Sequence, residues 1–147
     1  MNIEVKRFDE LSTTELYEIL RARAEVFIVE QDCVYQDLDN KDLGAYHVTV
    51  REDGKIVAYL RVLDRGVSYD TASVGRVITT EQGRGRGIGL ILLKEGLKAA
   101  KKYFSADKVT ISAQCQARGF YEKVGFVAVS EPYLEDNIPH VRMVLDL

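Results

Sequence analysis

The order of hydrophobic and polar positions predicts a strand and then a long helix in the first third of the chain. Ile3 and Val5 alternate with polar neighbours over residues 2–8, which is typical of a half-buried strand. Ser12-Thr13-Thr14-Glu15 has the S-x-x-E form of a capping box, so we expect a helix to begin there. The helix carries an apolar stripe on which Arg23 also falls, formed by Leu16, Ile19, Leu20 and Phe27. Residues 30–44 are polar and acidic and indicate a loop.

The middle of the chain has the pattern of a hairpin, a further strand and a second helix. Tyr46–Arg51 and Ile56–Leu63 are rich in β-forming residues and flank Asp53-Gly54, a dipeptide that favours a tight turn. Ser73–Thr79 is a third strand in this region. Gly87–Phe104 has apolar residues at helical spacing, with lysines on the opposite face, so it predicts an amphipathic helix.

The last third alternates between strand and helix patterns. Val109–Ala113 reads as a strand, and Gln116–Val124 reads as a short helix that a C-terminal glycine, Gly125, would close. Phe126–Val129 and Val141–Leu145 complete the set as strands. The predicted order is β-α-β-β-β-α-β-α-β-β. It indicates a single α/β domain over residues 1–147, with a central mixed sheet and helices on both faces.

Composition and charge narrow the classes of function. With a formal net charge of −3, the chain has no general electrostatic attraction to nucleic acid or to an anionic membrane surface. Its longest apolar runs, such as Leu90–Leu93, are too short to span a bilayer. Residues 1–7 lack the apolar region of a secretory signal. The two cysteines, Cys33 and Cys115, form no Cys-x-x-Cys motif, so we expect reduced thiols in a cytoplasmic protein, with a disulfide as the minor alternative.

Gly83-Arg84-Gly85-Arg86-Gly87-Ile88-Gly89 is the strongest local signal for ligand binding, because it joins a predicted strand to the longest helix. Glycines let a ligand approach the backbone, and the first amides of a helix attract phosphate. The Walker motif is excluded because its Lys-Ser/Thr ending is missing, and G-x-G-x-x-G fails in every register. An arginine-glycine tract that binds RNA and a purely structural turn are the other possibilities.

Other polar residues point to structure rather than to a metal site. Neither His47 nor His140 has a metal-binding partner at a workable spacing, so we expect no metal. The run from Asp37 to Asp42 fails the calcium-loop pattern. Tyr121 lies at helical spacing with apolar neighbours and could be a core residue. Arg23 on an apolar stripe needs a partner, either an acid of the next loop or a substrate.

Two motifs together give the sequence a resemblance to a known family. Arg84–Gly89 resembles motif A of the GCN5-related N-acetyltransferases, [Q/R]-x-x-G-x-[G/A], and Ala117–Phe126 resembles their motif B, with its alanine, tyrosine and Gly-Phe. The resemblance covers about the whole chain. The N-terminal signature, Arg23 and Val26–Gln31 with Cys33, Tyr35 and Asp39, and the C-terminal Glu135–His140 are similar to those of the ElaA-like branch.

The resemblance implies a fold and a cofactor site. It implies a mostly antiparallel, twisted sheet in which two parallel strands, Ser73–Thr79 and Val109–Gln114, splay apart to hold acetyl-CoA. The pantetheine arm would bond to the first strand as an added strand would. The implied cofactor-binding residues are Val77, Ile78, Thr79, Arg84, Gly85, Arg86, Gly87, Ile88, Gly89 and Gln114. Gln114 stands where the family often has asparagine, seven residues before the tyrosine.

The resemblance also implies an activity: transfer of acetyl from acetyl-CoA to a primary amine, by direct attack in a ternary complex. A small molecule is the expected acceptor, Tyr121 the expected general acid, and a homodimer is possible. The general base stays open, because residues 73–79 contain no acid. A non-catalytic module that binds or senses acyl-CoA is the alternative. Acceptor-binding candidates are Arg23, Glu30, Glu135, Asp136 and His140.

Overall fold

The computed structural model describes residues 1–147 as two antiparallel sheets with helices packed against them. The first sheet has the order β1-β2-β3-β4, with β1 at Asn2–Arg7, β2 at Tyr46–Glu52, β3 at Lys55–Leu63 and β4 at Ser73–Thr79. The second is built around β8, which pairs with the other three strands. Its members are β5 at Lys108–Gln114, β6 at Val127–Ala128, β7 at Tyr133–Glu135 and β8 at Ile138–Asp146.

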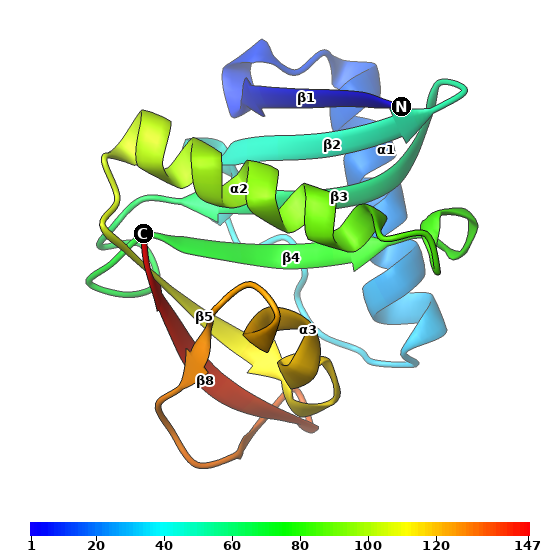
Figure 1. Cartoon of the computed structure of the whole chain (residues 1–147). Coiled ribbons are helices and arrows are strands. Elements are labelled where there is room, and N and C mark those ends of the chain that lie inside the picture. The colour runs from blue at the N-terminus through cyan, green and yellow to red at the C-terminus, as the bar shows by residue number, and fades with distance from the viewer.

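The two sheets meet where β4 and β5 begin. A single parallel bridge joins Ala72 to Val109, and the amide of Thr110 donates a hydrogen bond of 3.0 Å to the carbonyl of Ala72. Beyond this point the two strands diverge, as Figure 1 shows. The predicted α/β fold with splayed parallel strands is therefore confirmed. The predicted central sheet is divided into two sheets at the point where β4 and β5 splay apart.

Helices cover both faces of the first sheet. α1 (Thr13–Arg23) lies on one face, and α2 (Ile88–Phe104) lies on the other (Figure 1). Successive residues of β3 serve the two faces, since Tyr59 packs with α1 whereas Leu60 belongs to the larger core with α2. The short α3 (Arg118–Glu122) follows β5. None of these helices is long and apolar enough to cross a membrane.

Local signals in the sequence place several boundaries correctly. The capping box is formed, because Ser12 Oγ accepts from the Glu15 amide at 3.0 Å and Glu15 Oε1 accepts from the Ser12 amide at 2.8 Å. The β2–β3 turn has the expected positive φ at both Asp53 and Gly54, 50° and 76°.

Other expectations were wrong in extent. The first helix reaches Phe27 as predicted, but its last part is a π-helical segment, η2 (Ala24–Glu30), and the polar loop after it holds a 3₁₀ turn at Lys41–Gly44. The predicted helix Gln116–Val124 begins within a 3₁₀ turn at Cys115–Ala117 and continues as α3, which ends at Glu122. β7 was not predicted, because its three residues are too few to show a strand pattern. β8 begins at Ile138 because the two residues before it form a tight turn with positive φ.

Candidate functional site

A bulge in β4 shapes the region where the sheets separate. Tyr59 of β3 pairs with Ile78, but Arg61 pairs with Gly75, so two residues of β4 lie opposite Leu60. The extra residue is Arg76, whose φ of 52° is rare for a side chain of this size. Such a bulge interrupts the ladder and redirects side chains. Here it places the Arg76 side chain on a cavity between β4 and β5.

Two adjoining cavities are lined by residues of this bulged strand. The splay cavity, about 280 Å³, is bounded by the loop after η2, β4, β5 and the β7–β8 turn. The groove cavity, about 380 Å³, lies at the start of α2. Both share a set of lining residues, so they adjoin there: Val77, Ile78, Thr79, Arg84, Ala117 and Tyr121.

The glycine turn forms the floor of the groove cavity. Gly85 and Gly87 have φ of 77° and 74°, and no heavy atom lies within 4 Å of the position that a side chain would take at either one. Gly87 is the N-cap of α2 and no side chain caps the helix. The amides of residues 88–90 therefore have no partner within the helix. These free amides fit a pyrophosphate, in line with the predicted roles of Ile88 and Gly89, which also line this cavity.

The two arginines of the turn differ. Arg84 lines both cavities, donating to the Thr79 carbonyl at 3.0 Å and to Glu30 at 2.6 Å. Arg86 lines neither cavity, because its guanidinium pairs with Glu52 on the surface. Glu30 was predicted to bind the acceptor. Its carboxylate instead forms an ion pair with Arg84, and Glu30 does not line the splay cavity.

Tyr121 stands where the two cavities meet. Its ring is 9% exposed and packs edge-on against Phe120 and Phe126. Its hydroxyl has no hydrogen-bond partner in the protein, and burial raises the pKa of Tyr121 to about 12. The phenol therefore stays protonated at neutral pH and has its donor free. Tyr121 is therefore a core residue that also lines both cavities, and its role as general acid stays a prediction.

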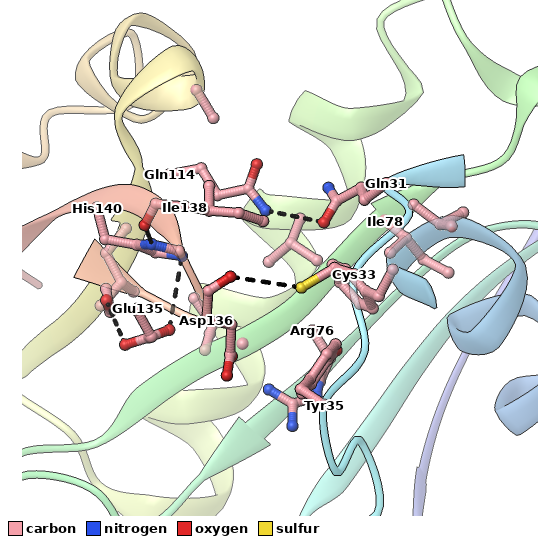
Figure 2. Close-up of a pocket in the computed structure, with 18 of the residues that line it drawn as sticks. Gln31, Cys33, Tyr35, Arg76, Ile78, Gln114, Glu135, Asp136, Ile138 and His140 are labelled. Carbon is pink, nitrogen blue, oxygen red and sulfur yellow. Dashed lines mark hydrogen bonds and ion pairs between the residues drawn. The ribbon is translucent and has the colours of Figure 1, made fainter. Parts of the chain in front are cut away.

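Contacts between distant segments close the splay cavity. Gln114 Nε2 donates to Gln31 Oε1 at 3.3 Å, and Cys33 Sγ lies 3.5 Å from the Asp136 carbonyl oxygen (Figure 2). These contacts join the loop after η2 to the second sheet. Gln114 was predicted to bind the cofactor, but it lines the splay cavity and not the groove.

The β7–β8 turn brings three predicted acceptor-side residues together. Glu135, Asp136 and His140 all line the splay cavity, facing Tyr35 and Arg76 across it (Figure 2). Asp136 and the next residue occupy the turn with φ of 51° and 62°. The Glu135 carboxylate lies 3.5 Å from His140 Nε2. The site therefore has an acidic wall with an imidazole beside it.

Arg23 has the structural role that its position on an apolar stripe left open. It is completely buried, pairs with Asp42 at 2.7 Å and Asp37 at 3.1 Å, and lines neither cavity. The sequence did not reveal that Arg76 and Arg61 join this network. Arg76 donates to Asp37 at 2.8 Å, so the network fixes one wall of the splay cavity. No group of His, Cys, Asp and Glu side chains is arranged to hold a metal ion.

The splayed strands and the glycine turn that opens α2 are the features that the resemblance to the N-acetyltransferases implied. Residues 10–147 match the family model described as the acetyltransferase (GNAT) domain. The chain therefore belongs to the GNAT family. The predicted resemblance is confirmed.

Relatives place the chain in the ElaA-like branch. Escherichia coli ElaA is 36% identical over 140 residues, 94% of this chain and 92% of that protein. Its crystal structure superposes with a TM-score of 0.89 and covers 98% of this chain and 99% of that one. An acyl-CoA N-acyltransferase from Pseudomonas aeruginosa is 40% identical with a TM-score of 0.90, and the match covers 97% of each chain. A UPF0039 protein of Schizosaccharomyces pombe is 40% identical over 144 residues, 97% of this chain and 95% of that protein.

Proposed function

We propose that this protein transfers the acetyl group of acetyl-CoA to a primary amine of a small molecule, with both substrates bound together. The observation that carries the proposal is Tyr121, a protonated phenol without a partner at the junction of two cavities. Because Tyr121 lines both cavities, two substrates could meet beside it without a covalent enzyme intermediate.

The groove cavity is the proposed site of acetyl-CoA. The free amides at the start of α2 would bind the pyrophosphate, assisted by the helix dipole. Val77 and Thr79 would offer backbone groups to the pantetheine arm along the edge of β4 that faces β5, where the strands have separated. Arg84 supplies a positive charge at the same place, partly offset by Glu30. Bound in this way, the thioester would point towards Tyr121.

The splay cavity is the proposed site of the amine. At about 280 Å³ it lies just below the range typical of small-molecule sites, which favours a small acceptor. Glu135 and Asp136 would attract an ammonium group to this wall. Arg76 lies opposite, but its charge is offset by Asp37 and Asp39.

The chemistry needs a donor for the sulfur that leaves. The thioester supplies an activated carbonyl carbon, which the amine nitrogen attacks. Tyr121 is a neutral phenol at working pH, so it can donate to sulfur as the C–S bond breaks. A thiolate in a partly dry site is poorly solvated, and a nearby O–H therefore lowers the barrier.

A thiol-release assay with acetyl-CoA tests this proposal. A panel of diamines, polyamines, amino acids and peptide N-termini would be offered, and mass spectrometry would identify the acetylated product. We expect at least one small amine to be acetylated in proportion to thiol released. Binding of acetyl-CoA by calorimetry without transfer to any amine would contradict the proposal and favour a non-catalytic acyl-CoA-binding protein.

A further inference from the structure

His140 is a nearly buried imidazole on the wall of the splay cavity, and its two nitrogens have different environments. His140 is 7% exposed and lies opposite Gln114 in the β5–β8 pairing. Nδ1 is 2.6 Å from the carbonyl oxygen of Ile138, and Nε2 is 3.5 Å from Oε2 of Glu135 (Figure 2).

These contacts define the tautomer of His140. A carbonyl oxygen can only accept a hydrogen bond, so Nδ1 must carry the hydrogen in the contact with Ile138. In the neutral ring Nε2 then presents a lone pair. The carboxylate of Glu135 also only accepts, so its attraction to Nε2 begins once Nε2 has gained a proton. Nε2 is therefore the nitrogen of His140 that can take up a proton, and a carboxylate oxygen lies beside it.

The other histidine has no such free nitrogen. His47 Nε2 lies 3.0 Å from the carbonyl oxygen of Asp42, and Nδ1 lies 2.7 Å from the hydroxyl of Tyr59. Both nitrogens are therefore engaged, and burial lowers the pKa of His47. His47 has the hydrogen on Nε2, the opposite tautomer to that of His140.

We infer that His140 is the general base of the transfer reaction, with the Glu135 carboxylate beside the nitrogen that takes up the proton. The inference rests on the proposed function. β4 offers no carboxylate, because Ser73–Thr79 contains no acid. Glu135 is less suited to be the base itself, since its Oε1 already accepts from Ser112 at 3.1 Å.

Two protons leave the acceptor during the reaction. The ammonium gives one to Nε2 of His140, and the amine that results attacks the carbonyl carbon. A C–N bond forms and the C–S bond breaks, while the second nitrogen proton goes to the departing sulfur by way of Tyr121. His140 then releases its proton to solvent. The balance is acetyl-CoA plus ammonium to amide, thiol and one proton.

A matched pair of variants separates a base from a structural histidine. In His140→Asn the side-chain amide can still donate to the Ile138 carbonyl, as Nδ1 does, but nothing replaces Nε2. In His140→Gln the amide falls nearer the position of Nε2 and the contact with Ile138 is lost. A structural role predicts that Asn restores activity and Gln does not. A general base predicts that both variants are slow, with kcat lowered roughly 10²-fold.

The pH profile gives a second readout. Without a base only the free amine reacts, so kcat/KM of His140→Asn should rise about tenfold per pH unit up to the pKa of the amine. The wild-type profile should level off at lower pH, and the two should converge at high pH. The other charged and titratable groups near His140 are the same in the wild-type protein and in His140→Asn: Cys33, Tyr35, Arg76, Arg84, Tyr121, Tyr133, Glu135, Asp136 and Arg142.

The experiment uses the acceptor with the highest kcat/KM in the thiol-release panel. Affinity for acetyl-CoA, measured by calorimetry, should be unchanged in both variants and would show that they are folded. Independently, ¹⁵N NMR of the two histidines should show the Nδ1–H tautomer for His140 and the Nε2–H tautomer for His47, with His140→Asn giving the assignment.

The outcomes are distinguishable. A wild-type rate in His140→Asn, or the Nε2–H tautomer at His140, overturns the inference about the base and leaves the proposed function intact. Failure of the wild-type protein to acetylate any amine overturns both. Slow transfer in both variants, with the predicted pH profile, supports His140 as the base.

Discussion

The buried charge network beside the splay cavity makes a quantitative prediction about stability. Asp42 is 5% exposed, and its Oδ1 accepts from Arg23 at 2.7 Å and from Arg61 at 2.9 Å. Asp42→Asn keeps the shape of the side chain but removes the negative charge that these two buried guanidinium groups share. Removing one partner of a buried ion pair typically costs about 3–5 kcal/mol.

The lower end of that range applies here, because each arginine retains a second acid. Arg23 keeps Asp37 at 3.1 Å, and Arg61 keeps Asp39 at 2.6 Å. A loss of about 3 kcal/mol in the free energy of unfolding corresponds to a fall in Tm of roughly 6–12 °C for a domain of this size. Urea unfolding followed by circular dichroism would give the free energy, and a thermal scan would give Tm.

The matched control is Asp146→Asn, which removes an exposed partner of Lys108 at 3.7 Å. Exposed pairs contribute about 0–1 kcal/mol, so Tm should hardly move. An equal effect of the two substitutions would refute the reasoning, because it would mean that burial of the network does not matter.

The same network predicts how the difference depends on pH. The arginines hold the pKa of Asp42 below its usual value despite the opposing effect of burial. A carboxyl with a depressed folded pKa contributes stability above its unfolded pKa, about 3.9, and loses that contribution as the pH falls through the folded pKa. The gap in unfolding free energy between wild type and Asp42→Asn should therefore be constant near neutrality and shrink below about pH 4.

Two further predictions concern the substrate sites. Gly87→Glu should weaken binding of acetyl-CoA at least ~10-fold in calorimetry, because it sets a carboxylate beside the free amides of α2. The control Gly87→Ala has open space and only the strain of a positive φ, about 1–2 kcal/mol of stability. Equal affinity of Gly87→Glu and Gly87→Ala for acetyl-CoA would place the pyrophosphate elsewhere. Asp136→Asn is compatible with the positive φ and removes about 1 kcal/mol of electrostatic attraction for an ammonium group. The KM for a cationic amine should therefore rise about fivefold, while the KM for acetyl-CoA stays constant. A parallel change in the two KM values would mean that the acceptor site lies away from this turn.

The sequence predicted those parts of the fold that depend on local chemistry. The capping box at Ser12 and the Asp53-Gly54 turn are set by a few neighbouring residues, and both formed as expected. The alternating strands and the helix after the glycine turn follow from periodicity. β7 could not be found in this way, because a three-residue strand is stabilised by its pairing with β8 and not by its own composition.

The candidate site was predicted in part for a similar reason. The glycine turn and Tyr121 carry a motif, so their place in the groove could be inferred. The bulge at Arg76 depends on the register between two strands, and no pattern within Ser73–Thr79 reports that register. The partners of Arg84 and Arg86 come from distant segments, so the sequence could not show that Arg86 turns to Glu52 and leaves the groove.

The role of Tyr121 is the central claim, and the rate of acetyl transfer by Tyr121→Phe in a single turnover tests it most directly. The substitution keeps the ring and its contacts with Phe120 and Phe126 and removes only the hydroxyl that has no partner in the protein. We predict that the rate falls at least ~10-fold, about 1.4 kcal/mol of barrier, with the affinity for acetyl-CoA unchanged. A wild-type rate in the Phe variant, with chemistry limiting, would contradict the account and leave Tyr121 as a core residue only.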